Sequence, residues 1–217
     1  MSAGVPWAIV MTHTDPDDRL AAAVAALRAG ELVIYPTETF YGIAADPEAP
    51  RAIAKIFEAK GRAENQPIAL IAADNASAFG LARKVPTLAR RLASLFWPGP
   101  LTLVLPARDG LHPAVLGPDG VGVRVSSHPL ARQLAAAFGR PITATSANLS
   151  GHPATVSPDE VRASLGDKIK VLLEDGVLAG GAASTVVAIT SDGYRIIRQG
   201  AVAADTIAAA AAGKEVA

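Results

Sequence analysis

The 217-residue sequence contains no cysteine, which excludes disulfide bonds, thiolate metal sites and cysteine nucleophiles. Aromatic residues make up only 5% of the chain, although half of all residues are hydrophobic, so we expect a core of alanine, valine, leucine and isoleucine. An excess of charge of either sign is also absent, because 20 basic and 20 acidic residues cancel. This balance argues against broad electrostatic binding to nucleic acid, but it is compatible with a local basic cleft.

Long apolar runs and targeting signals are missing too. No apolar run reaches the length of a membrane span, and the N-terminus has no basic region followed by an apolar one. We therefore expect a cytoplasmic protein with no membrane partner.

Several common site motifs are absent. Gly180-Gly181 is not followed by the Gly-Lys-Ser/Thr of a phosphate-binding loop, and no Gly-x-Gly-x-x-Gly opens a helix. Ser146 does not lie in the Gly-x-Ser-x-Gly turn of a hydrolase. The four histidines are scattered, and none has metal-ligand spacing. The sequence therefore does not support a P-loop NTPase, a Rossmann dinucleotide site, a serine hydrolase or a metal site built by the protein.

Alternating strand and helix patterns predict an α/β fold with a mixed sheet, without a second domain or an internal repeat. Helix starts are clear where proline opens the first turn, as at Pro16 and Pro50. Helices are expected over residues 15–30, 50–60, 74–82, 86–96, 129–138, 157–165 and 205–212. Strands are expected over residues 5–11, 31–35, 67–72, 101–105, 121–126, 141–146, 169–174, 184–190 and 194–198, and flexible loops over 117–122 and 176–183.

The stretch from residue 35 to residue 62 departs most clearly from this regular pattern. Gly42 is expected to allow a backbone turn there. Three residues with side-chain oxygens precede it, namely Thr37, Glu38 and Thr39. The following helix delivers Lys60 and Arg62 at its C-terminal end, where two cations can clamp a phosphate or a carboxylate. The alternative is that both cations merely complement the helix dipole.

Three further places break the pattern, and such breaks often mark function. Arg124 is a cation in a strand of valine and glycine, and it either enters a site or points outward from a half-exposed strand. Ser146 and Asn148 follow the C-terminal end of a strand, where ligands collect in α/β sheets; alternatively, they form a turn that satisfies its own backbone. Ser184 and Arg198 stand at the open end of the predicted hairpin, as a binding pair or as an ordinary polar end.

The four cations in these places predict a polyanion pocket that a nucleoside triphosphate would match: Lys60, Arg62, Arg124 and Arg198. Read together, the segments resemble the YrdC-like family, the threonylcarbamoyl-AMP synthases. Seven segments carry the resemblance in order: Tyr35–Gly42, Lys60–Arg62, Pro98–Thr102, Val123-Arg124, Ser146–Gly151, Ser184–Val187 and Arg198–Gly200. The match runs over roughly residues 15 to 200.

The resemblance implies a fold and a reaction. The fold would be a YrdC-like catalytic domain over residues 1–200, with a twisted mixed β-sheet flanked by helices around a basic cavity, and a short alanine-rich tail over 201–217. The reaction would condense L-threonine, bicarbonate or CO2, and ATP to L-threonylcarbamoyl-AMP and pyrophosphate, and the ATP would carry Mg2+. A partner transferase would then pass the threonylcarbamoyl group to a tRNA adenosine beside the anticodon, and a weak contact with tRNA is a further expectation.

The resemblance also assigns residues by position. Threonine would contact four residues: Thr39, Arg124, the backbone of Ala144, and Ser184. ATP would contact six: Lys60, Arg62, Gln66, Ser146, Asn148 and Arg198. Lys60 and Arg62 would be the catalytic pair that holds the triphosphate. Two departures from the family pattern stand out, because Ala63 replaces a common proline and Ile71 replaces a histidine that some members place near threonine.

Two alternative functions use the same basic concavity. An RNA-binding or ribosome-maturation module would bind there without chemistry, but the neutral net charge and the absence of a basic-aromatic surface pattern count against it. A carbamoyl-adenylate former acting on carbamoyl phosphate, like the related domain of hydrogenase-maturation proteins, would be a long chain with zinc-finger-like cysteines. This chain has no cysteine.

Overall fold

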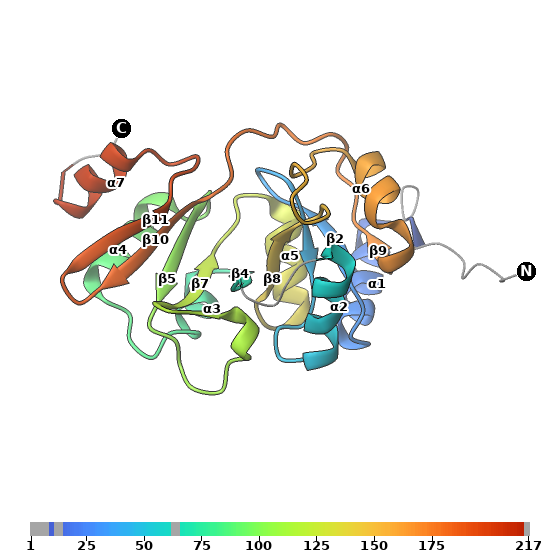
Figure 1. The fold of residues 1–217 in the computed structure, drawn as a ribbon, viewed down its shortest axis with the longest axis horizontal. Helices are drawn as coiled ribbons and strands as arrows, with labels where there is room; N and C mark the ends of the chain where they lie inside the picture. The colour runs from blue at the N-terminus through green and yellow to red at the C-terminus, as the bar shows by residue number, and fades with distance from the viewer. Residues whose placement is uncertain (1–8, 11–14, 62–65, 215–217) are drawn as a thin grey trace, which may run out of the picture.

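The computed structural model describes residues 9–10, 15–61 and 66–214, and a twisted mixed sheet runs through the whole molecule (Figure 1). Its strands are β1 (Ile9–Val10), β2 (Val33–Pro36), β3 (Tyr41–Ala44), β4 (Ala69–Ile71), β5 (Leu101–Leu105), β6 (Leu116–Gly117), β7 (Gly120–Arg124), β8 (Ile142–Ser146), β9 (Val171–Leu172), β10 (Thr185–Thr190) and β11 (Gly193–Arg198). They are ordered β1-β9-β2-β3-β8-β4-β7-β5-β10-β11, with β6 paired to β7. Four neighbouring pairs run parallel, namely β1–β9, β9–β2, β4–β7 and β10–β5. The predicted α/β fold with a mixed sheet is confirmed.

Helices cover the sheet and enclose its apolar residues. They are α1 (Pro16–Arg28), α2 (Pro50–Lys60), α3 (Asn75–Phe79), α4 (Thr87–Phe96), α5 (Pro129–Phe138), α6 (Pro158–Leu165) and α7 (Ala204–Ala211), with short 3-10 turns at Pro113–Val115 and Gly166–Lys168. Proline opens α1, α2, α5 and α6, as expected from its fixed φ, and left-handed glycines end α2 and α5.

Side-chain alternation along β2 explains why one half of the sheet is covered on both faces. Val33 and Tyr35 pack in the cluster that includes α1 and α5, whereas Ile34 packs in the cluster that includes α2 and α6. Successive strand residues point to opposite faces, so a run that is apolar throughout needs helices on each side. A third cluster joins α3, α4 and α7 to β5, β7 and β10 in the other half of the molecule.

The region around Gly42 differs from the sequence prediction. Gly42 does not form the turn; it lies inside β3, which pairs antiparallel with β2 and places Gly42 opposite Tyr35. A Cβ on Gly42 would lie 3.2 Å from the Tyr35 ring, so glycine leaves room for the aromatic side chain. The turn itself lies earlier, over residues 37–40.

One further local prediction needed correction. The loop expected over residues 117–122 is mostly strand, because β6 and β7 pair there through Gly117 and Gly120. The C-terminal helix forms as expected, and its Ile207 and Ala210 are buried in the same cluster as α4. The part of the strand expected over residues 5–11 that precedes Ile9 lies outside the described residues. In the described ranges, no helix combines the length and the apolar character needed to cross a bilayer.

Candidate functional site

Four of the predicted site residues lie at the ends of strands. Arg124, Ser146 and Arg198 are the last residues of β7, β8 and β11, and Ser184 immediately precedes β10. Lys60 is the last residue of α2. The site is therefore assembled by the sheet from segments that are far apart in the chain, and its contacts form two groups.

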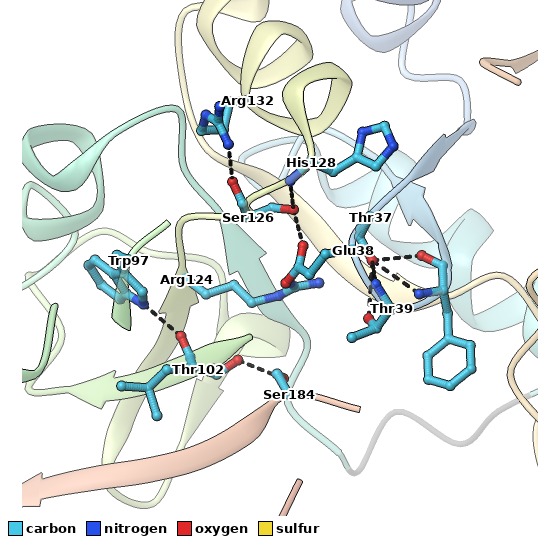
Figure 2. Close-up of polar contacts among 12 residues, drawn as sticks. Thr37, Glu38, Thr39, Trp97, Thr102, Arg124, Ser126, His128, Arg132 and Ser184 are labelled. Atoms are coloured by element: carbon cyan, nitrogen blue, oxygen red, sulfur yellow. Dashed lines mark hydrogen bonds and ion pairs between the residues drawn. The ribbon is translucent and has the colours of Figure 1, made fainter. Parts of the chain in front are cut away.

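The first group centres on Arg124, which is only 7% exposed and donates through Nη1 to a carboxylate oxygen of Glu38 (Figure 2). The other carboxylate oxygen of Glu38 accepts from the hydroxyl of Ser126. Ser126 is itself fixed, because Arg132 donates to its carbonyl at 2.6 Å and the His128 amide donates to its hydroxyl at 3.2 Å. The sequence left open whether Arg124 enters a site or points outward, and in the structure its side chain points inward.

The turn that carries Glu38 is held by Thr37. The Thr37 hydroxyl accepts from the backbone N–H groups of Thr39 and Phe40, each at 3.2 Å, and donates to the Phe40 carbonyl at 2.7 Å. It also lies 3.1 Å from the Thr39 hydroxyl. Side-chain hydroxyls commonly stabilise turns in this way. The turn consequently fixes both Thr39, a predicted threonine contact, and Glu38, which the site prediction omitted.

Tyr35 lies close enough to Arg124 and Glu38 for both charges to affect its pKa. Burial raises the pKa of Tyr35 well above its ordinary value, while Arg124 lowers that pKa and Glu38 raises it by smaller amounts. The hydroxyl therefore stays protonated, and it donates to the Thr143 carbonyl at 2.9 Å. Tyr35 thus acts as a rigid neutral neighbour of the ion pair.

Arg198 reaches the same region from β11. Its Nη2 donates to the carbonyl and the hydroxyl of Ser184 at 2.9 and 3.1 Å, and the Ser184 and Thr102 hydroxyls share a hydrogen bond of 2.9 Å. Burial and, secondly, the like charge of Arg124 lower the pKa of Arg198. The like charges of Arg124 and Arg198 therefore repel each other, and a bound anion would offset this repulsion.

The second group surrounds Lys60, which is 4% exposed. Its Nζ lies 2.5 Å from the Ser146 carbonyl, 2.8 Å from the Asn148 carbonyl and 3.3 Å from Asn148 Oδ1. The Asn148 amide group donates in turn to the carbonyls of Leu149 and His152 at 2.9 and 2.6 Å. The structure thus brings together Lys60, Ser146 and Asn148, three of the residues predicted to bind the nucleotide.

The remaining predicted residues differ in how far they are buried. Gln66 is exposed, and Ala144 is half-buried in β8 opposite Ala69 of β4. Ile71 is fully buried in a core cluster with α1 and α5, so this side chain has an apolar packing role. Arg62 and Ala63 lie outside the described residues, and their roles stay predictions.

Two surface cavities, of about 200 and 290 Å3, lie near His112, and their lining residues include none of the predicted site. The candidate site is therefore defined by its convergent polar groups. The basic cavity expected around these residues stays a prediction. Glu38, Ser126 and Thr102 were not predicted as site residues. Glu38 is one of the polar residues that follow Pro36 in the sequence. No sequence pattern predicts that it contacts Arg124.

Gly200→Ala is expected to destabilise the protein, because a Cβ at Gly200 would lie 2.1 Å from the Ala183 carbonyl oxygen and 2.6 Å from the Ser184 carbonyl carbon. Backbone atoms cannot move aside as a flexible side chain would. We expect a loss of about 2 kcal/mol or more of unfolding free energy, or roughly 4–8 °C in Tm, measured by thermal unfolding.

Gly80→Ala is the matched control for this experiment. Gly80 has a φ of −62° and ends α3, and its nearest atoms to a Cβ are 3.4 and 3.5 Å away. We expect its stability to stay within about 0.5 kcal/mol of the wild type. Equal stability of Gly200→Ala and the wild type would contradict the close approach between Gly200 and the backbone of Ala183 and Ser184.

Several known proteins are similar to this chain over most of its length. The family model Sua5_yciO_yrdC, described as "Telomere recombination", matches residues 25–200. A threonylcarbamoyl-AMP synthase of Bacillus subtilis is 38% identical over 195 residues, which cover 89% of this chain and 56% of that protein. One of Chromohalobacter salexigens is 38% identical over 182 residues, covering 83% of this chain and 97% of that protein.

Among solved structures, P. abyssi Sua5 complexed with L-threonine superimposes with a TM-score of 0.87 at 35% identity, covering 93% of this chain and 60% of that one. The chain thus spans little more than half the length of some relatives and nearly the whole of others.

Proposed function

Because this chain belongs to the Sua5/YciO/YrdC family, we propose that it is an L-threonylcarbamoyladenylate synthase, a nucleotidyltransferase. It condenses L-threonine, bicarbonate or CO2, and ATP to threonylcarbamoyl-AMP and pyrophosphate. A partner tRNA threonylcarbamoyl transferase uses the product to modify the adenosine next to the anticodon, with weak tRNA contact by this protein.

One observation supports the proposal: Arg124 is buried beside Glu38 at the end of β7, and Arg198, which donates to Ser184, has its pKa lowered by burial and then by the like charge of Arg124. A guanidinium group suits a carboxylate or a phosphate, because its donors match two oxygens of either group. Two guanidinium groups in one site suit a reaction between two anions.

Threonine and ATP divide the site between them. Thr39, Arg124, the Ala144 backbone and Ser184 hold threonine, and the nucleotide is held by Lys60, Arg62, Gln66, Ser146, Asn148 and Arg198. The hydrogen bonds from Arg198 to Ser184, at 2.9 to 3.2 Å, join the two sets. The amino acid and the phosphates consequently meet at this junction.

The chemistry requires positioning and charge neutralisation. The amine of threonine first becomes a carbamate, which is unstable in water, so a site that limits water access preserves it. A carbamate oxygen then attacks the α-phosphorus of ATP, and pyrophosphate leaves. Cations offset the repulsion between the two anions and stabilise the charge that develops on pyrophosphate.

ATP brings its magnesium ion into the site as part of the substrate, bound by the phosphates. In the part of the chain that the structure describes, no group of three His, Asp or Glu side chains is arranged to hold an ion.

Incubation of the protein with ATP, magnesium, bicarbonate and labelled L-threonine tests the proposal. We expect pyrophosphate and a threonine-containing adenylate, both dependent on bicarbonate and on threonine. Product formation only with carbamoyl phosphate would replace the proposal with carbamoyl-adenylate formation. Tight RNA binding without any adenylate would replace it with the RNA-binding alternative.

A further inference from the structure

The residues assigned to threonine leave one end of that amino acid without a partner of opposite charge. Arg124 offers a cation to the carboxylate, and Thr39, Ser184 and the Ala144 backbone offer neutral groups. Free threonine is a zwitterion at neutral pH, and its ammonium group is costly to desolvate without an anion or several acceptors. An acidic group beside Arg124 would supply that anion, and one is present.

Glu38 occupies that position. Its carboxylate contacts Nη1 of Arg124 through one oxygen and the Ser126 hydroxyl through the other, and Arg124 and Glu38 retain 9% and 15% side-chain exposure. An ionised carboxylate has about four acceptor positions, so these two contacts leave acceptor capacity for a ligand. Glu38 also adjoins Thr39 in the turn held by Thr37.

We propose that Glu38 and Arg124 together form a binding pair for the α-amino acid zwitterion, in which Glu38 accepts from the α-ammonium group while Arg124 donates to the carboxylate. This inference rests on the proposed function. The two charged ends of an α-amino acid are adjacent, as are the two charged ends of a contacting Arg–Glu pair. The pair itself is neutral, so it favours a zwitterion over a polyanion, and it thereby reserves Arg124 for threonine in a site that also admits ATP.

Binding measurements on Glu38→Gln test this role, because glutamine keeps the shape of the side chain and removes its charge. Calorimetric titration without ATP compares L-threonine with 2,3-dihydroxybutanoate, in which a hydroxyl replaces the α-amino group. In the wild type we expect threonine to bind at least ~10-fold more tightly than the hydroxy analogue, as for loss of a charge-assisted hydrogen bond. In Glu38→Gln we expect this preference to disappear because only threonine binding weakens.

Glu48→Gln is the matched control, since Glu48 pairs with Arg140 at the surface, with 49% and 43% side-chain exposure. We expect it to bind both ligands like the wild type. If Glu38→Gln does not fold, Glu38→Asp provides the test: it keeps the charge but shortens the reach, and it must weaken threonine more than the analogue.

The outcomes distinguish failure of the inference from failure of the synthase proposal. Equal weakening of both ligands would mean that Glu38 only positions Arg124, and it would overturn the inference while product formation by the wild type upheld the synthase. An unchanged preference of Glu38→Gln for threonine over the hydroxy analogue would also overturn the inference. A wild type that neither binds threonine nor forms the adenylate would overturn both the synthase proposal and the inference.

Discussion

Lys60→Ala is expected to lower the rate of pyrophosphate release at least ~100-fold, comparable to the loss of a preorganised charge contact in other active sites. Lys60 is buried at the end of α2, and its ammonium contacts both carbonyls of the Ser146–Asn148 turn. The substitution therefore removes a fixed positive charge from the proposed phosphate site. It also releases the turn that carries Ser146 and Asn148, two of the proposed nucleotide contacts.

Two controls separate these effects from general destabilisation. Lys60→Met removes the charge but keeps most of the apolar volume, so a similar loss of rate in this variant identifies the charge as the cause. Lys55→Ala removes a lysine of the same helix that pairs with Glu31 at the surface, with 38% side-chain exposure. We expect Lys55→Ala to keep a near wild-type rate. Near wild-type rates for folded Lys60→Ala would mean that the phosphates bind elsewhere.

The elements with strong local signals could be predicted from the sequence. Helices α2 and α5 have proline at the start, glycine at the end and apolar residues at helical spacing, and the structure has both where they were expected. Strand β3 was missed because Phe40, Tyr41 and Gly42 look like a turn when read locally. Pairing with β2 and β8 decides the conformation there, and the sequence alone does not reveal such pairing.

The same limit applies to the site. The sequence identified Arg124 as unusual but left its direction open, because a strand residue can face either side of a sheet. Its partner Glu38 is 86 residues away in the chain, and the Ser126–Glu38 contact spans 88 residues. Only the arrangement of β7 beside the turn that follows β2 brings these groups together. Breaks in the sequence pattern also singled out six other residues, namely Lys60, Arg62, Ser146, Asn148, Ser184 and Arg198. Resemblance to a family added Gln66 and Ala144 and the division between threonine and ATP, and these roles in binding stay predictions.

Arg124→Ala is expected to raise the KM for L-threonine ~100-fold, which corresponds to about 2.7 kcal/mol of binding energy, while the KM for ATP changes less than about threefold. The reason is the division of the site. Arg124 is already paired with Glu38, whereas Arg198, one of the proposed nucleotide residues, donates to Ser184 instead. Steady-state kinetics with each substrate varied in turn measures the two constants.

The substitution also leaves Glu38 as a largely buried carboxylate without its cation, which is costly in itself. Arg124→Ala combined with Glu38→Gln removes that unpaired charge, and we expect the double variant to recover stability but not threonine affinity. Arg195→Ala is the control for loss of an exposed arginine outside the proposed site, because Arg195 lies in β11, has a side chain 57% exposed and pairs with Asp119. An equal rise of both Michaelis constants in Arg124→Ala would show that Arg124 serves the nucleotide as much as the amino acid, and would refute the division of the site on which the mechanism depends.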